Sequence, residues 1–357
     1  SMRNTPIGVA PDGRFLFNAV DPLEDGCDAT FIAPREGFSA PAGQLAQGGA
    51  CDAGGDDQDI LLTNARGSNG NSDVFSISMA KDFDYTTPLI NKPGAFKFQF
   101  GYAYTDAEIR NPTTSSTATS NFEEQAVTNI NFPDLAPSQF ANDHNITLRF
   151  GFEQEFVTDL STNLDFFYNA RSGRPFSYTF AGDTGEDVFG DTDDEERLLF
   201  YVPTGVDDPL VQFGEGFDTE AFFGFLESSG LNEFAGQVAP RNEFNDPWFH
   251  DIDMRFSQEL PGLPGLFDDD RFLFFVDIEN LLNLIDDGSN VLRVNDNGAI
   301  AEGFPVLTAD ISDDGSQYIY NSFSGGNVDF DDLQDGVFET VSNPSLWAVQ
   351  FGVRYEF

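Results

Sequence analysis

Hydrophobic and polar side chains alternate one by one along several segments of this chain. The clearest segment is Ser345–Phe357. One set of alternate positions there is wholly apolar or aromatic: Trp347, Val349, Phe351, Val353, Tyr355 and Phe357. The other set is small or polar: Ala348, Gln350, Gly352, Arg354 and Glu356. A period of two residues predicts a β-strand with two different faces. The segment is longer than the ~9–11 residues that a tilted strand needs to cross a bilayer.

The same alternation recurs upstream, and we expect about eight membrane-spanning strands. The further segments are Asp73–Phe83, Ala95–Tyr104, Asn145–Phe156, Asn163–Arg171, Asp251–Gln258 and Arg271–Glu279, with Arg14–Val20 as a weaker candidate. The connections alternate in length. The short ones are Asp84–Gly94, Val157–Ser161 and Leu260–Asp270, and the long ones are Asp21–Ser72, Thr105–His144, Phe180–Phe249 and Leu281–Pro344. This pattern is typical of outer-membrane barrels with long extracellular loops, which predicts a periplasmic C-terminus.

Charged side chains occupy the second face of the predicted strands. An Arg or Lys that faces lipid at mid-membrane costs ~2–4 kcal/mol, so we expect this face to line a lumen. The predicted lumen-facing residues are Lys97, Gln99, Arg149, Glu153, Asp165, Asn169, Arg171, Asp253, Arg255, Asp277, Glu279, Gln350 and Arg354. The predicted fold class is therefore all-β, an antiparallel transmembrane β-barrel.

The long loops are predicted to hold small elements of their own. Asp218–Ser228 has the pattern of a short helix, with Asp218 as its N-cap. Leu198–Val202 and Gln317–Phe323 are predicted to be strand extensions or loop hairpins.

Composition adds two constraints. The chain has 40 Phe, which a lipid-facing surface tolerates well, and no run of apolar residues long enough for a membrane helix. The net charge of -44 argues against nucleic-acid binding, because nothing could neutralise a row of phosphates. Anionic lipid is a poor direct partner unless divalent cations bridge the two surfaces. The charge fits an acidic surface in salty water, or a lumen and loops that attract cations.

Few residues suggest chemistry. Cys27 and Cys51 lie in one Gly/Asp-rich segment; they form a disulfide outside the cytoplasm, or remain two free thiols. His144 and His250 lack clustered ligands, which favours interface roles over metal binding. No catalytic or nucleotide-binding signature is present, so we expect no enzyme.

Acidic runs offer weak Ca²⁺ candidates, with solvated charge as the alternative. The candidates are Asp191, Asp193, Asp194, Asp329 and Asp331, together with the runs at Asp310–Asp314 and Asp268–Asp270. No other cofactor is expected.

The two ends of the chain carry different signals. Ser1-Met2 starts without a basic or an apolar signal region, so we expect a piece of a longer protein. The C-terminal residues Phe351, Val353, Tyr355 and Phe357 resemble the signal that the barrel assembly machinery reads. Alternatively, Phe357 is only the end of a lipid-facing strand.

Several motifs resemble the C-terminal barrel of Oar-like TonB-dependent receptors, over roughly Ile60 to Phe357. They are Arg241-Asn242, Asp246–Phe249, Asp251–Phe256, Gln258–Gly262 and Asp277–Asn283, and upstream Leu62–Gly67, Tyr102–Ala107, Arg171–Phe176 and Tyr201–Gly205. Their order and spacing carry the resemblance more than any single motif does.

The resemblance implies that the chain supplies about the last third of a 22-stranded barrel with a plugged lumen. No plug domain is found in residues 1–357, so the plug, the other strands and TonB would be partners. Outer-membrane lipid and lipopolysaccharide would surround the strands. The implied function is energy-coupled passage of a substrate across the outer membrane. The alternative is an autonomous eight-stranded barrel with a structural or adhesive role.

Overall fold

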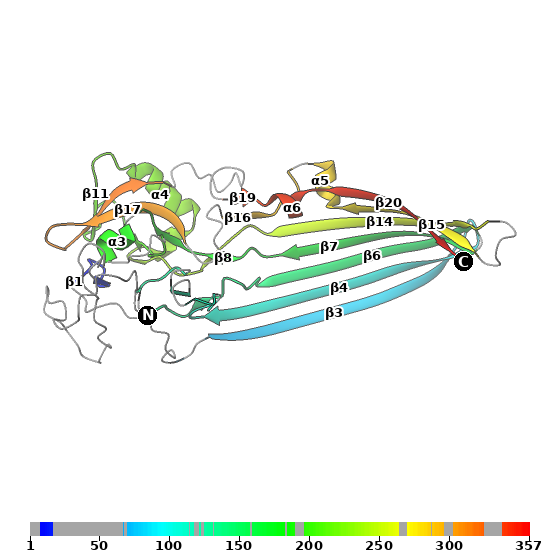
Figure 1. Cartoon of the computed structure of the whole chain (residues 1–357), viewed down its shortest axis with the longest axis horizontal. Helices are drawn as coiled ribbons and strands as arrows, with labels where there is room; N and C mark the ends of the chain where they lie inside the picture. Colours follow the sequence, from blue (N-terminus) through cyan, green and yellow to red (C-terminus); the bar gives the residue numbers. More distant parts are fainter. Residues whose placement is uncertain are drawn as a thin grey trace.

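A long antiparallel sheet dominates the molecule (Figure 1). The computed structural model describes residues 8–16, 67, 70–113, 115–117, 121–122, 125–130, 132–157, 159–182, 184–189, 196–263, 270–286, 288–295, 303–324 and 338–357. Seven long strands pair in chain order: β3 (Gly70–Thr87), β4 (Lys92–Ile109), β6 (His144–Val157), β7 (Leu160–Arg171), β14 (Phe249–Pro261), β15 (Arg271–Glu279) and β20 (Ala348–Glu356). The two-residue strand β5 (Ala136–Pro137) pairs with the C-terminal end of β4.

The prediction of an all-β, antiparallel fold is confirmed, while the prediction of eight spans is wrong for the described residues. The weak candidate Arg14–Val20 does not enter the sheet where it is described. Instead, β2 (Phe15–Leu16) pairs with β1 (Gly8–Val9). Arg14 is buried there and forms an ion pair with Asp12. Residues 17–20 lie outside the described residues. The described sheet is open, with β3 and β20 at its edges.

The final strand is shorter than the alternation predicts. β20 has nine residues, and α6 (Ser342–Ser345) covers the start of the predicted segment. The hydroxyl of Ser345 donates to the carbonyl of Val341, which closes this helical turn before the strand begins. Nine residues still reach the lower limit of the ~9–11 that a tilted bilayer crossing needs.

The connections alternate as predicted. Short turns join β3 to β4, β6 to β7, and β14 to β15 at the end of the sheet where the C-terminus lies (Figure 1). The long connections all leave the opposite end. Because the strands pair in chain order with alternating direction, β3 and β20 both run toward the short-turn end.

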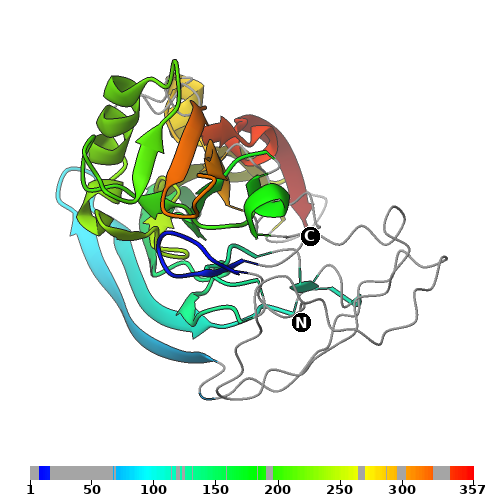
Figure 2. The ribbon, with the colours of Figure 1, turned by 90° about the vertical axis from the view of Figure 1, so that its left-hand side faces the viewer.

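The long connections pack together into one body, which we call the loop unit (Figures 1 and 2). Its centre is a four-stranded sheet in the order β11 (Val211–Phe213), β18 (Tyr318–Phe323), β17 (Phe304–Ile311) and β9 (Tyr178–Phe180). Around it lie α3 (Thr184–Phe189), α4 (Thr219–Ser228), the 3₁₀ turn η1 (Leu231–Phe234) and the pairs β10 (Tyr201–Val202) with β12 (Gln237–Val238), and β8 (Pro175–Phe176) with β13 (Phe244–Asn245). Nearer the long sheet are α5 (Leu281–Ile285) and the pair β16 (Arg293–Asn295) with β19 (Phe338–Thr340).

The elements predicted inside the loops are confirmed. Helix α4 begins after Asp218, whose carboxylate accepts a 3.0 Å hydrogen bond from the backbone N–H of Ala221. This caps one of the free N–H groups of the first turn. The predicted strand residues around 198–202 and 317–323 belong to the loop unit rather than extending the long sheet.

Phenylalanine explains why the loop unit holds together. Its buried rings include Phe176, Phe180, Phe189, Phe200, Phe222 and Phe225, with Tyr178, Tyr318 and Tyr320 among them. Burial of each such ring stabilises the fold by roughly 1.5–3 kcal/mol. The sequence interpretation assigned the abundant Phe to a lipid-facing surface, and the loop unit core is a second destination.

Three buried arginines tie distant segments of the loop unit together. Each donates a hydrogen bond from its guanidinium to backbone carbonyls far along the chain. These bonds join Arg14 to Leu199, Arg197 to Phe122, and Arg241 to Arg110 and Asp134. Burial lowers the pKa of Arg241 to about 10.

Candidate functional site

The strand register divides the long sheet into one polar and one apolar face. Residues paired directly across neighbouring strands point to the same side. On one side, Phe98 pairs with Phe150, Phe150 with Phe166, and Phe166 with Met254. On the other side, Lys97 pairs with Gly151 and Gly151 with Asp165. We call these sides the apolar face and the polar face.

All thirteen residues predicted to face a lumen share the polar face. Alternation predicts this correctly because a strand cannot change faces without a bulge. The described register places its one irregularity in this part of the sheet after Glu155, beyond the last predicted residue of β6.

Charges of opposite sign alternate along one row of the polar face. Successive register partners place these residues in line across the strands: Asp82, Lys97, Gly151, Asp165, Arg255, Asp277 and Gln350. Opposite charges on directly paired positions stabilise a sheet by roughly 0.2–1 kcal/mol per pair. The row therefore balances charge locally in a chain that is strongly acidic as a whole.

Ion pairs connect this row to its neighbours. The ammonium of Lys97 lies 2.6 Å from a carboxylate oxygen of Glu153, and Arg149 lies 2.9 Å from Asp165. The Arg255–Asp277 contact is longer, at 3.4 Å. Because these side chains are partly exposed, each pair contributes only about 0–1 kcal/mol. Their main effect is to hold the charged groups in defined positions.

Three phenylalanines lie on the polar face beneath arginines, which the alternation pattern does not predict. Guanidinium carbons stand 5.3, 5.4 and 4.9 Å from the ring centres of Phe167, Phe249 and Phe275. Their partners are Arg149, Arg171 and Arg255, respectively. A guanidinium stacked on a ring and bonded to a carboxylate is fixed in orientation. The sequence signal was visible as adjacent aromatic residues, such as Phe166-Phe167 and Phe274-Phe275.

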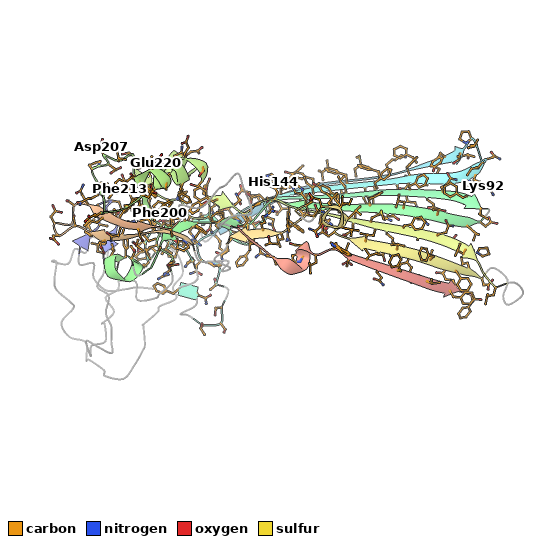
Figure 3. All side chains as sticks on the ribbon, turned by 90° about the horizontal axis from the view of Figure 1, so that it is seen from above. Lys92, His144, Phe200, Asp207, Phe213 and Glu220 are labelled. Carbon is orange, nitrogen blue, oxygen red and sulfur yellow. The ribbon has the colours of Figure 1, made fainter. Side chains whose placement is uncertain are left out.

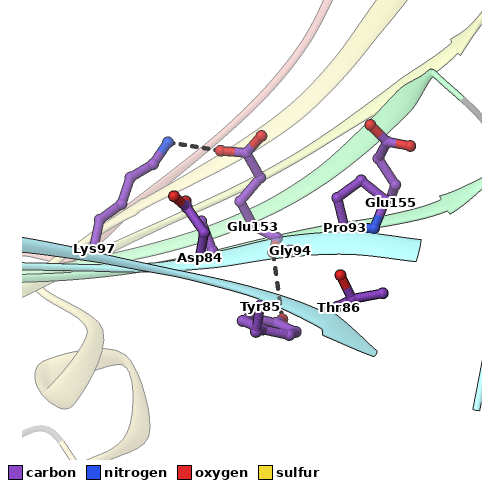
Figure 4. Close-up of a pocket in the computed structure, with 9 residues that line it drawn as sticks. Asp84, Tyr85, Thr86, Pro93, Gly94, Lys97, Glu153 and Glu155 are labelled. Carbon is purple, nitrogen blue, oxygen red and sulfur yellow. Dashed lines mark hydrogen bonds and ion pairs between the residues drawn. The ribbon is translucent and has the colours of Figure 1, made fainter. Parts of the chain in front are cut away.

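A hollow of about 560 Å³ opens at the short-turn end of the polar face (Figure 4). Strands β3, β4 and β6 line it, and Lys97 and Glu153 point toward each other across it. Asp84 and Glu155 add two further carboxylates. With one ammonium among three carboxylates, the hollow suits polar or cationic groups better than anions.

A belt of stacked rings, which we call the upper belt, crosses the apolar face where the long sheet meets the loop unit. Figure 3 places His144 at this boundary and Lys92 at the opposite end. The rings of His144 and His250 both stack with that of Trp248, with centroids 5.7 and 6.1 Å from it. Two hydrogen bonds extend the belt: one of 2.9 Å between the Tyr102 hydroxyl and Nδ1 of His144, and one of 2.8 Å between the Tyr168 hydroxyl and Nδ1 of His250. Both histidines are thus interface residues of this belt.

A second belt, which we call the lower belt, crosses the same face near the short turns. Tyr85 stacks on Phe96, and Phe272 packs against Tyr355. Between these pairs lie Gln154, Thr162 and Gln258, and the Thr162 hydroxyl donates to the side-chain amide oxygen Oε1 of Gln258. The two belts bound the apolar rows of the sheet.

The separation of the belts can be measured along the strands. Tyr104 pairs with His144 in the upper belt, and Gly94 pairs with Gln154 in the lower belt. These positions are ten residues apart on both β4 and β6. Ten residues span ~33 Å of strand. At a tilt of ~35–45° that length covers roughly 23–27 Å, the height of the apolar band of outer-membrane barrels.

Asp208 is a buried carboxylate of the loop unit that accepts several hydrogen bonds. Burial by itself raises the pKa of this group, but four hydrogen bonds outweigh it and lower the pKa. They come from the backbone N–H and hydroxyl of Thr204, the N–H of Leu210 and the hydroxyl of Tyr201. Burial, together with the adjacent carboxylate of Asp208, raises the pKa of Tyr201 to about 12.

The described residues hold no cluster of His, Cys, Asp or Glu that fits a metal ion. Asp191, Asp193, Asp194, Asp329 and Asp331 lie outside the described residues, as do Cys27 and Cys51 and their expected disulfide. Asp314 is described, and its carboxylate accepts hydrogen bonds from Ser312 and Ser316 within a turn. Those bonds lower its pKa to about 2. Its geometry is that of a turn-stabilising carboxylate.

Comparisons with protein-family models, with curated proteins and with solved structures find no match to this chain. Among the described helices, none is long and apolar enough to cross a membrane.

Proposed function

We propose that this chain forms part of the wall and the outer cap of an outer-membrane β-barrel of the TonB-dependent receptor type, as its resemblance to Oar-like receptors implies. In this proposal, the apolar face contacts lipid and lipopolysaccharide, and the polar face lines the substrate passage. The loop unit is extracellular, and Phe357 lies at the periplasmic side. A plug and TonB would supply energy coupling, and this chain would carry no catalytic step.

The observation that carries the proposal is the apolar face with its two belts. Aromatic rings bound the lipid-facing band of such barrels on both sides, and the belts here have the matching separation. Large apolar side chains between the belts stay exposed, including Ile77, Met79 and Phe351. An exposed apolar surface of this extent marks contact with lipid or protein. The salt-bridged opposite face fits a polar lumen.

A cysteine-accessibility experiment tests the proposal. Phe166 and Asp165 are neighbours on β7 that point to opposite faces. In a Cys27→Ser, Cys51→Ser background, each is changed to cysteine and exposed to a water-soluble maleimide in intact outer membranes. We expect labelling of Asp165→Cys and protection of Phe166→Cys. Equal labelling of the two positions in the membrane would refute the proposal.

The alternative of an autonomous adhesive barrel has one feature in its favour, the loop unit with its own packed core. The edges of the described sheet argue against it. Because β3 and β20 run in the same direction, their direct closure would require a parallel pair. Antiparallel closure needs an odd number of additional strands between them.

Disulfide trapping separates the two candidates. Cysteines replace Ser78 on β3 and Gln350 on β20, in the same cysteine-free background. The barrel-segment proposal predicts no intramolecular disulfide between the two edges. A disulfide formed in good yield within one chain, with a heat-modifiable monomer on gels, would favour the autonomous barrel.

A further inference from the structure

Lys81 is a charged residue on the apolar face. It pairs directly with Phe98, and the same row continues through Phe150, Phe166, Met254, Ile278 and Val349. Every other member of the row is apolar. Lys81 is exposed, and its ammonium stands 5.6 Å from the ring centre of Phe83 on the same strand. Within the described part of the chain, no ion pair joins Lys81 to a carboxylate.

The depth of Lys81 makes this placement unfavourable in lipid. Its row meets β6 at Phe150, six residues from His144 in the upper belt and four from Gln154 in the lower belt. Lys81 therefore lies near the middle of the band. A lysine that faces lipid at the centre of a barrel wall is strongly destabilising, and the penalty vanishes only near the interfaces. Ionisable residues at such depth are paired and mark functional contacts.

Lys81 also lies on an edge strand. β3 pairs with β4 on one side only, and most of its side chains are exposed on both faces. Its free N–H and C=O groups cannot remain unpaired in hydrocarbon. Since β3 runs toward the short-turn end, an antiparallel partner must run toward the loop unit. None of the described strands is available in that position, because residues 8–16 lie in the loop unit.

We propose that β3 is completed by a strand running toward the loop unit that carries an Asp or Glu on the apolar face beside Lys81. This inference rests on the proposed barrel function and names the partner of its free edge. An Asp or Glu in the directly paired position would have its Cβ atom ~4.5–5.5 Å from that of Lys81. The pair would neutralise both charges within the band. It would also fix the register, because a slip by two residues separates the charges.

Photo-crosslinking in the outer membrane tests the partner. Benzoylphenylalanine replaces Met79, one row away from Lys81 on the same face, so that Lys81 is kept. The matched control carries it at Phe166, which has neighbouring strands on both sides. We expect position 79 to link to one strand segment, identified by mass spectrometry, with an Asp or Glu on the apolar face at the level of Lys81. Links only to lipid, to β20, or to a strand without such a carboxylate would overturn the inference.

The control also separates this inference from the proposed function. Links from Phe166 to lipid support the barrel whatever position 79 reports. If Phe166 fails to reach lipid, the barrel proposal itself fails.

The direction in which a substitution at Lys81 changes the thermal stability provides a second test. If Lys81 faces a carboxylate, Lys81→Met leaves that group buried and alone, and the folded form should be lost at a lower temperature on heat-modification gels. If Lys81 faces lipid, the same change removes an unfavourable charge and should raise that temperature. Lys81→Arg should retain the wild-type midpoint in the paired case. A rise for Lys81→Met would contradict the inference.

Discussion

The ring of Phe275 covers Gly352, its direct partner across the β15–β20 pair, and its outer atoms occupy the space where a Cβ atom of residue 352 would be. The guanidinium of Arg255 lies over the same ring, 4.9 Å from its centre. The ring thus contacts both a glycine and a stacked cation. Tyr85 covers Gly94 in the same way across β3 and β4, on the apolar face. Covering a strand glycine with an aromatic ring restores the packing that the missing side chain cannot give.

Gly352→Ala should therefore weaken the attachment of β20. The new methyl group would displace the Phe275 ring, which cannot move without leaving Arg255. Overpacking of this kind costs about 1–3 kcal/mol. The measurement is the urea midpoint of the folded protein in detergent micelles. Gly205→Ala is the control, since a side chain there meets no atom within 4 Å. Equal midpoints for the two variants would contradict the proposed role of the ring.

Arg14→Met should destabilise the loop unit more than any surface change. The guanidinium donates to the carbonyl of Leu199 and to the hydroxyl of Tyr318, and it pairs with Asp12. Both charged side chains are nearly fully buried. Removing one partner of a buried pair leaves the other uncompensated and costs about 3–5 kcal/mol.

Adding Asp12→Asn to Arg14→Met should recover part of that loss, because the unpaired carboxylate is then gone. Hydrogen exchange of loop-unit peptides measures both effects. A double variant that is less stable than Arg14→Met alone would contradict the buried ion pair.

The long sheet could be predicted from the sequence because its signal is local. Alternation along Lys97, Phe98 and Gln99 assigns each residue to a face without knowledge of its neighbours. Short turns bring β3 and β4, β6 and β7, and β14 and β15 together, whereas the pairs β4–β6, β7–β14 and β15–β20 form across long connections. The thirteen polar-face residues share one face for this reason.

The loop unit could not be predicted, because its contacts join residues far apart in the chain. Arg14 reaches Leu199, and Tyr320 reaches the carbonyl of Tyr201. No local period signals such contacts. The weak prediction of a spanning strand at Arg14–Val20 fails at Arg14, because tertiary contacts bury this side chain in the loop unit. Alternation along Asp73–Phe83 places Lys81 on the same face as Met79 and Phe83, but no local pattern indicates what its ammonium contacts.

Gly224→Ala should stabilise helix α4. Gly224 is exposed in the helix interior, and a side chain there meets no atom within 4 Å. Replacing glycine by alanine inside a helix gains about 0.5–1 kcal/mol, because the unfolded chain loses freedom. Thermal unfolding of the loop unit, followed by near-ultraviolet circular dichroism, measures the gain. A lower midpoint would mean that residue 224 is not in a regular helix.

Asp208→Asn should make the stability of the loop unit less dependent on acid pH. The pKa of Asp208 is lower in the folded protein than its ordinary value, because hydrogen bonds from Thr204, Leu210 and Tyr201 outweigh the effect of burial. A group with a lowered folded pKa adds stability above its unfolded pKa, about 3.9, and that stability is lost as pH falls through the folded value. Near pH 7 the substitution should cost about 1–3 kcal/mol, since a buried acceptor is weakened. The difference between wild type and variant should shrink below about pH 4, where the wild-type carboxylate also becomes neutral.

Asp207→Asn, at the exposed neighbouring position, controls for the loss of one negative charge. Hydrogen exchange of peptides around residue 208 at pH 7, 5 and 3.5, corrected for intrinsic rates, measures the difference. A gap that stays constant over this range would show that the ionised carboxylate does not hold this turn together.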